Sequence, residues 1–262
     1  MKIIVCIKQV PDAKDIQWTS NNTMKREGVE GVINACDLYA IETALEIKKK
    51  NPQTQIIVFS MGPMQAENIL RQAIALGADE AFLICDKIFS GSDTLATGLT
   101  LSSAIKAVVP DFDIVFCGQY ASDGDTAQTG VEIAENLNAF QVTYALDVLD
   151  INEKSVIVSQ DCEDYIQSVE VPLPAVVCVM ENKTKQLSDA LIIGQMRAQD
   201  AQIKILTFND LELKDNQVGI KGSPTYVSNV FRPKINRKCE IIDSHNAIEF
   251  AMQITEKVLK SE

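Results

Sequence analysis

The sequence predicts an α/β fold in which a mostly parallel sheet carries helices on both faces. In the first 140 residues, short apolar runs rich in β-branched residues alternate four times with segments whose apolar residues recur at helical spacing. After Gln141 strand-like runs follow one another without helices, which predicts an antiparallel extension at one edge of the sheet. The chain has 262 residues, of which 46% are hydrophobic. This is enough to form the core of one large domain with an appended arm.

The parallel part is expected to consist of strand and helix pairs. The expected strands are residues 2–7, 54–60, 80–85 and 113–117. The expected helices are residues 37–50, 66–77, 91–109 and 131–137. Asp37 is a plausible N-cap of the first helix, and Gly77 a plausible C-cap of the second. Residues 15–26 interrupt this order, and their polar centre flanked by Trp18 and Met24 predicts a hairpin.

The later part of the chain is expected to begin with four more strands, at residues 142–149, 155–159, 165–171 and 175–180. The apolar patch at residues 191–196 leaves two interpretations open, a short core helix or a docking loop. Beyond residue 203 we expect one more strand, an extended arm, and a terminal helix opened by a capping box of Asn246 and Glu249. A basic cluster in the arm is either solvated surface or a docking patch (Arg232, Lys234, Arg237 and Lys238).

Net charge, cysteine pattern and hydrophobic runs indicate which partners and which cellular environment to expect. A net charge of −12 argues against nucleic acid as a partner, because the phosphate backbone would be repelled. The seven cysteines are scattered without a C-x-x-C pair, which favours a reducing cytoplasm. No apolar run approaches the roughly 20 residues of a membrane helix, and Lys8 ends the first apolar run, so we expect neither membrane insertion nor a signal peptide.

The segment from Cys117 to Gly130 is the strongest candidate for a ligand site. It joins a predicted buried strand to the start of a predicted helix, and its small residues let the backbone come close to a ligand. Thr126, Gln128 and Thr129 bring hydroxyl and amide groups to the first helical turn, where free N–H groups favour a phosphate. The alternative is an ordinary connection between strand and helix, capped by Asp and Ser.

Three other loops should lie beside this segment. In a parallel sheet all strands end at the same edge, which is where such folds bind ligands. The loops after the first three strands are residues 7–12, 60–63 and 90–94, and each carries Gly, Ser, Asp, Pro or Thr. The sequence therefore predicts a site built from four loops.

These residues resemble the small (beta) subunit of electron-transferring flavoproteins. The resemblance runs from Met1 to about Met180 and is strongest in the Asp-Gly-Asp-Thr-Ala-Gln run. It is carried by residues 4–12, 26–29, 33–37, 73–79, 93–97, 123–128 and 173–175. It implies a Rossmann-like sheet similar to that of the adenine-nucleotide alpha-hydrolases, and pairing with a large alpha subunit that carries FAD.

The resemblance also implies a nucleotide in this subunit, FAD in bifurcating members and AMP in plain carriers. Gly124 and Ala127 stand where the AMP-binding form has bulkier polar residues, which makes room for FAD. Carried over by position, the expected contacts are Cys6, Ile7, Lys8, Asn34, Asp37, Ser60, Met61, Gly62, Asp93, Thr94, Thr97, Ala121, Gly124, Asp125, Thr126, Gln128 and Thr129.

The implied mechanism is flavin-based electron bifurcation. NADH gives a hydride to this subunit's flavin, one electron continues to ferredoxin, and the other passes through the alpha-subunit FAD to an acyl-CoA or 2-hydroxy acid dehydrogenase. Residues 192–198 resemble the family's recognition loop, with Ile192 as the anchor and Met196 beside it. The chain departs from bifurcating relatives at Gln119, Tyr120 and Ser122, where these usually carry Arg, Gln and Ile.

Three interpretations follow for the domains and the function. Residues 1–202 are expected to form the flavin-binding domain, with the recognition loop at about 181–202, and residues 203–262 an arm and helix that wrap the partner subunit. The first interpretation is a bifurcating subunit with FAD. The second is a plain electron carrier with AMP, and the third a stand-alone nucleotide-binding sensor, which would need neither the recognition loop nor the arm.

Overall fold

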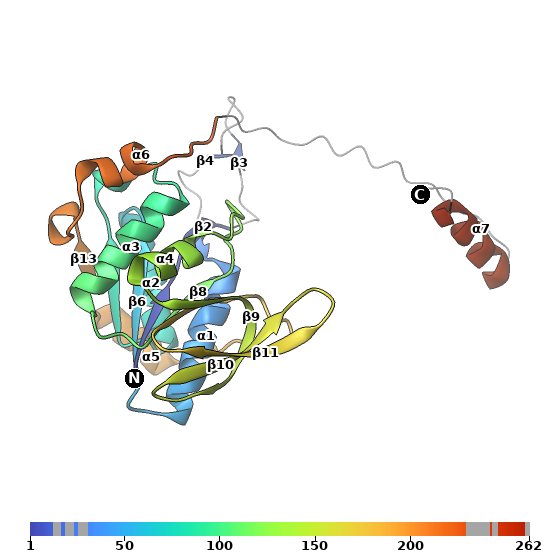
Figure 1. Cartoon of the computed structure of the whole chain (residues 1–262), viewed down its shortest axis with the longest axis horizontal. Helices are drawn as coiled ribbons and strands as arrows, with labels where there is room; N and C mark the ends of the chain where they lie inside the picture. Colours follow the sequence, from blue (N-terminus) through green and yellow to red (C-terminus); the bar gives the residue numbers. More distant parts are fainter. Residues whose placement is uncertain (13–16, 19–23, 26–30, 229–241, 243–245, 260–262) are drawn as a thin grey trace. The chain divides into compact units, whose positions relative to one another are not determined.

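The computed structural model describes residues 1–12, 17, 18, 24, 25, 31–228, 242 and 246–259 (Figure 1). The chain divides into two compact units, Met1–Ser228 and Asn229–Glu262. The first unit contains a sheet of nine strands in the order β11-β10-β9-β12-β8-β1-β6-β7-β13. The sheet therefore confirms the predicted α/β class.

The strands of the large sheet are β1 (Lys2–Cys6), β6 (Gln55–Met61), β7 (Glu80–Ile84), β8 (Ile114–Gly118), β9 (Phe140–Ile151), β10 (Ser155–Asp161), β11 (Ile166–Pro172), β12 (Ala175–Val179) and β13 (Lys204–Leu206). Two small antiparallel pairs lie outside it. β2 (Gln9–Pro11) pairs with β5 (Gly31–Ile33), and β3 (Gln17–Trp18) pairs with β4 (Met24–Lys25). The second pair confirms the predicted hairpin.

The helices are α1 (Ala35–Lys50), α2 (Glu67–Leu76), α3 (Thr94–Val108), α4 (Thr129–Leu137), α5 (Ile192–Asp200), α6 (Gly219–Gly222) and α7 (Ala247–Leu259). Short 3₁₀ turns are η1 (Met64–Ala66), η2 (Lys87–Phe89), η3 (Phe208–Asp210) and η4 (Asp215–Gln217). Gly77 ends α2 with φ 139°, so the predicted C-cap is confirmed. Within the described residues, no helix has both the length and the apolar character needed to cross a membrane.

Alternate residues of each central strand face different helices. Ile3 and Val5 of β1 pack with α1 and α2, whereas Ile4 and Cys6 pack with α3 and α4 on the other face of the sheet (Figure 1). Both faces are thus buried, which explains why these strands are continuous apolar runs rather than alternating ones.

The four strands after Gln141 do not form one antiparallel extension as expected. β9, β10 and β11 pair antiparallel, but β12 pairs parallel with both β8 and β9 and lies between them. The burial of these strands gives the reason. Every residue of β12 is buried, so it requires a central position, whereas β11 is largely exposed and lies at the edge.

The last strand and α5 complete the first unit. β13, which we had placed in the arm, pairs parallel with β7 at the edge of the sheet opposite β11. The interpretation of residues 191–196 as a core helix is wrong, because Leu191, Ile192, Ile193 and Met196 are all exposed. The basic cluster of Arg232, Lys234, Arg237 and Lys238 lies outside the described residues.

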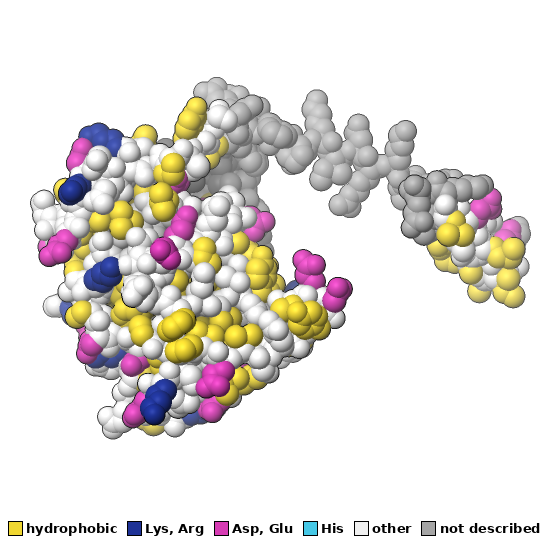
Figure 2. All heavy atoms as spheres, viewed as in Figure 1, with side chains coloured by type: hydrophobic (Ala, Val, Ile, Leu, Met, Phe, Trp, Pro, Cys, Tyr) yellow, Lys and Arg dark blue, Asp and Glu magenta, His cyan; other side chains and the backbone are white. Residues whose placement is uncertain are grey.

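In the second unit, α7 is an amphipathic helix. Oδ1 of Asn246 accepts hydrogen bonds from the N–H groups of Ile248 (3.1 Å) and Glu249 (2.9 Å), which confirms Asn246 as the cap of this helix. Hydrophobic side chains, among them Ile248 and Met252, are exposed on it (Figure 2). Such an apolar face is typical of a helix that packs against another surface.

Candidate nucleotide-binding site

The four predicted loops lie at one edge of the sheet. β1 is central, with β6 and then β7 on one side and β8 on the other, and all four strands run parallel. The chain leaves β1 for α1 on one face and leaves β8 for α4 on the other. The strand order therefore reverses between β1 and β8, and the crevice at such a point is where open parallel sheets bind nucleotides.

Asp37 lies at the base of this crevice. It is not the N-cap of α1 as predicted, because α1 begins at Ala35. Its carboxylate instead accepts hydrogen bonds from the N–H groups of Lys8 (2.7 Å) and Gly118 (2.9 Å), one at the end of β1 and one at the end of β8. The carboxylate thus satisfies both N–H groups and connects the ends of the two strands.

Burial raises the pKa of Asp37 to about 7. The side chain is only 5% exposed, and the loss of hydration disfavours the charged form. Hydrogen bonds from Lys8, Asn34 and Gly118, together with the charge of Lys8, lower the pKa but do not cancel the effect of burial.

Asn34 occupies the N-cap position of α1, but its side chain makes no capping hydrogen bond and bonds to the loop after β8. Its Nδ2 donates to the carbonyl of Tyr120 (2.9 Å), and its Oδ1 accepts from the N–H of Ser122 (3.1 Å). The side chain is 2% exposed. Asn34 therefore fixes the first part of that loop.

The loop between β8 and α4 is a turn with open space beside it. The carbonyl of Ala121 accepts from the N–H groups of Gly124 (3.2 Å) and Asp125 (2.8 Å). Asp125 and Ala127 have φ of 49° and 55°, in the left-handed region. A Cβ added at Gly124 would meet no described atom within 4 Å. The loop therefore leaves room for a ligand where Gly124 lacks a side chain.

The side chains around this loop are polar. Nζ of Lys8 forms an ion pair with Asp123 (2.6 Å). Oγ1 of Thr94 lies 3.1 Å from Oε1 of Gln128 and 3.1 Å from Oε1 of Glu132, so the starts of α3 and α4 are tied together. Of the remaining predicted contacts, Thr126 is exposed, and Thr97 and Thr129 are half-buried.

Residues 223–225, far from it in the sequence, form hydrogen bonds to the loop before α3. Asp93 caps α3 by accepting from the N–H of Ala96 (3.1 Å), and the same carboxylate accepts from the N–H (3.0 Å) and hydroxyl (2.8 Å) of Thr225. The N–H of Asp93 donates to Oγ of Ser223 (2.8 Å). Burial alone raises the pKa of Asp93, but these hydrogen bonds outweigh it and hold the pKa below its usual value. The sequence Gly222-Ser-Pro224 indicates a turn there, but not which loop this turn contacts.

The last residues of β1 and β6 and the residue after β1 are largely buried. Cys6 and Ile7 are buried, and burial raises the pKa of the Cys6 thiol. Ser60 is completely buried, and its hydroxyl has no hydrogen-bond partner among the described residues. The next residues are Met61 and Gly62, whose N–H donates to the carbonyl of Ile84 (3.1 Å). A buried hydroxyl without a partner in the protein fits a bound ligand as its hydrogen-bond partner.

Ile192 and Met196 lie elsewhere, on α5. They are 77% and 61% exposed. α5 packs on the carboxyl end of α2, where Arg197 donates to the carbonyls of Ile74 (2.8 Å) and Ala78 (2.8 Å). Ala78 precedes β7, so α5 lies towards the amino end of this strand, away from the four loops.

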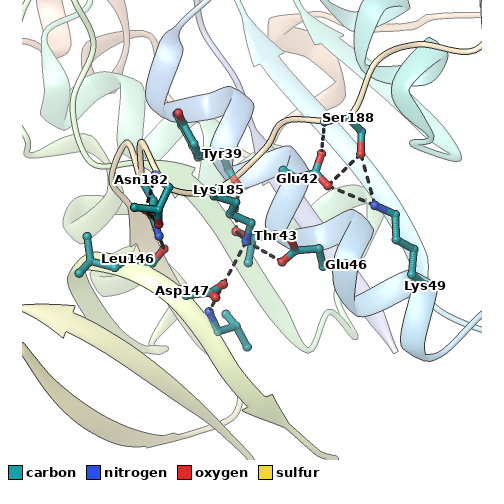
Figure 3. A network of polar contacts seen from close by, with 12 residues as sticks. Tyr39, Glu42, Thr43, Glu46, Lys49, Leu146, Asp147, Asn182, Lys185 and Ser188 are labelled. Atoms are coloured by element: carbon teal, nitrogen blue, oxygen red, sulfur yellow. Dashed lines mark hydrogen bonds and ion pairs between the residues drawn. The ribbon is translucent and has the colours of Figure 1, made fainter.

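The segment that leads from β12 to α5 is held on the outer face of α1 (Figure 3). Lys185, whose side chain is 8% exposed, forms ion pairs with Glu46 (2.6 Å) and Asp147 (3.0 Å). Glu42 accepts from the N–H (2.7 Å) and hydroxyl (2.9 Å) of Ser188. Burial raises the pKa of Glu42, but its hydrogen bonds to Ser188 and Lys49 outweigh this effect and hold the pKa below its usual value. α1 thus carries Asn34 and Asp37 near its start and supports the path to α5 along its length.

Comparison with known proteins gives a family match over most of the chain. The model of the electron transfer flavoprotein domain matches residues 21–211. The chain is 41% identical over 261 residues to the caffeyl-CoA reductase-Etf complex subunit CarD of Acetobacterium woodii, with 98% of each chain covered. It is 41% identical over 260 residues to the electron transfer flavoprotein subunit beta of Thermoanaerobacterium thermosaccharolyticum, again with 98% of each covered. Protein FixA of Azorhizobium caulinodans is 38% identical over 251 residues, covering 93% of this chain and 89% of the relative.

Proposed function

Because the chain belongs to the electron transfer flavoprotein family and is one of its beta subunits, we propose that it is a cytoplasmic bifurcating subunit that binds FAD. In this proposal it pairs with a large alpha subunit that carries a second FAD. The pair takes electrons from NADH and passes them to ferredoxin and to a partner dehydrogenase.

The observation that carries the choice of FAD is the open space beside Gly124. A cradle for a mononucleotide alone would be expected to fill this space with a side chain, whereas a longer dinucleotide needs it free. No described atom lies within 4 Å of the position where a Cβ would be. The unpartnered hydroxyl of Ser60 is a second group that fits a ligand at these strand ends.

The proposed contacts come from all four loops. Thr126, Gln128 and Thr129 would hold the phosphates at the start of α4, where the helix dipole favours negative charge. Lys8 would add a positive charge on the β1 side. The remaining proposed contacts are Cys6, Ile7, Ser60, Met61, Gly62, Asp93, Thr94, Thr97, Ala121, Gly124 and Asp125, and Asn34 and Asp37 would support the loops from the start of α1.

The chain's own share in the reaction is binding and positioning. Hydride acceptance from NADH and the separate release of two electrons are chemistry that the flavin supplies when bound. The buried strand ends at Cys6, Ile7 and Ser60 exclude water from one side of the site. The bonds from Asn34 and Asp37 keep the loops after β1 and β8 at a constant separation.

We place the dehydrogenase contact on α5. Ile192 and Met196 are exposed aliphatic side chains on a helix that is anchored to α2, so they can enter a pocket of a partner at little entropic cost. The Acetobacterium relative is named as a subunit of a caffeyl-CoA reductase complex, which supports an acyl-CoA dehydrogenase as the partner over a 2-hydroxy acid dehydrogenase.

The test is to express the chain with its large subunit and to count the flavin and adenine nucleotide released per heterodimer. Two FAD support the proposal. One FAD with one AMP would instead identify a plain electron carrier. If two FAD are found, reduction of ferredoxin by NADH that depends on the dehydrogenase and its acceptor tests bifurcation itself.

A further inference from the structure

Asn34 and Asp37 are candidates for cofactor contacts by resemblance, yet both side chains are used by the protein itself. Each oxygen of the Asp37 carboxylate accepts a backbone N–H, and the Asn34 amide bonds to one carbonyl and one N–H of the loop after β8. Both are almost completely buried. Little of either side chain is therefore available to a ligand.

We infer that Asp37 and Asn34 are positioning residues, which hold the loops after β1 and β8 in their binding geometry before any cofactor is present. The inference rests on the proposed function only in that the ligand of these loops is an adenine nucleotide. It assigns the contact with the cofactor to the loop atoms and not to these two side chains.

The arrangement around Gly118 supports this role. A Cβ at Gly118 would lie 2.2 Å from Oδ1 of Asp37 and 2.8 Å from Cβ of Cys36. The glycine therefore lets the carboxylate approach the end of β8 closely enough to bond its N–H. Residue 118 and residue 37 are 81 positions apart, so this is a contact between elements and not a local turn.

Asn34 extends the same connection into the loop. Tyr120 and Ser122 lie on either side of Ala121, whose carbonyl accepts from Gly124 and Asp125. The amide of Asn34 thus holds the residues from which the ligand-facing turn starts. Together the two side chains connect the start of α1 with β1, β8 and the turn.

The groups that face Asp37 make the connection sensitive to pH. Lys8 is the positively charged neighbour, and the thiols of Cys6, Cys36 and Cys117 interact with it from β1, α1 and β8. Because the pKa of Asp37 is about 7, the carboxylate is largely ionised at pH 8 and largely protonated at pH 6. Protonation turns one carboxylate oxygen of Asp37 from a hydrogen-bond acceptor into a hydroxyl donor. One of the two hydrogen bonds to the backbone N–H groups is therefore weakened at low pH.

The decisive experiment measures amide hydrogen exchange at single residues in the nucleotide-free heterodimer at pH 8. Asp37→Asn replaces one acceptor by a donor, so the N–H of Lys8 or Gly118 should exchange about tenfold faster than in the wild type. Asn34→Ala should do the same at Ser122. Thr100→Val is the matched control, because the Thr100 hydroxyl is buried and bonds only to Ala96 of its own helix.

Titration of the same proteins with FAD and with AMP completes the test. Asp37→Asn should bind the nucleotide about tenfold more weakly than wild type at pH 8, and the difference should shrink at pH 6. The inference is overturned if affinity falls while amide protection is unchanged, since Asp37 would then touch the ligand. It is also overturned if neither quantity changes.

Gly118→Ala gives an independent readout should Asp37→Asn fail to fold. Its methyl group displaces the carboxylate without altering the charge of the site, and it should raise exchange at Lys8 as Asp37→Asn does. Unchanged exchange at Lys8 in a folded Gly118→Ala protein would contradict the inference. If the wild type binds neither FAD nor AMP, the proposed function fails, while the exchange measurement still decides the role of Asp37.

Discussion

Replacing Gly124 by aspartate adds a charge where we propose that FAD binds. The residue is exposed, its φ is outside the left-handed region, and the new Cβ meets no described atom within 4 Å. The fold should therefore tolerate the change, with an effect on the free energy of unfolding within about 0.5 kcal/mol. Any loss of flavin then reports on the site and not on misfolding.

The expected loss follows from the repulsion between the new carboxylate and a phosphate. At about 4 Å this costs ~1 kcal/mol in bulk water and ~4 kcal/mol at an effective dielectric constant near 20. These values correspond to FAD binding that is roughly 5-fold to several-hundred-fold weaker. The purified heterodimer should then retain close to one FAD rather than two.

The assay is release and quantification of FAD and AMP from the purified heterodimer, followed by titration with FAD. Gly124→Asn is the matched control, because asparagine has nearly the same volume as aspartate but no charge. Gly124→Ala shows the effect of the smallest added side chain. Gly124→Asp with unchanged flavin content and wild-type affinity would show that FAD does not occupy the space beside residue 124.

Three further predictions concern the partner, the support of α5 and the effect of pH. Ile192→Asp should lower electron transfer to the dehydrogenase at least tenfold with flavin content unchanged, as measured by dehydrogenase titration; equal transfer would remove Ile192 from the interface. Lys185→Met leaves Glu46 and Asp147 facing each other and should cost about 1–3 kcal/mol, seen as a melting temperature several degrees lower; an unchanged value would mean that the ion pairs add no stability. The pKa of Asp37 is raised from 3.8 to about 7 on folding, so the folded chain binds this proton more tightly, and this contribution to stability is lost as pH rises from about 4 to about 7. Asp37→Asn should flatten that part of the stability profile in thermal unfolding, and an identical slope would contradict the assignment.

The local pattern of apolar residues was sufficient to predict the central strands of the sheet. A strand covered on both faces must be apolar throughout, so β1, β6, β7 and β8 could be recognised without knowing their neighbours. Because parallel strands end at one edge, the loops that follow them also had to meet there. The position of the four loops was in this sense contained in the sequence.

The tertiary structure decided what depends on distant partners. The place of β12 between β8 and β9 follows from competition among strands for buried positions, which no single segment reveals. The carboxylate of Asp37 looked like a helix cap from sequence, yet it bonds to Lys8 and Gly118 because the sheet order brings the ends of β1 and β8 beside α1. The hydrogen bonds that join Asp93 to Ser223 and Thr225 connect residues about 130 positions apart. Periodicity reports which face of an element is buried, but only the packed chain determines which polar groups are left to pair with one another.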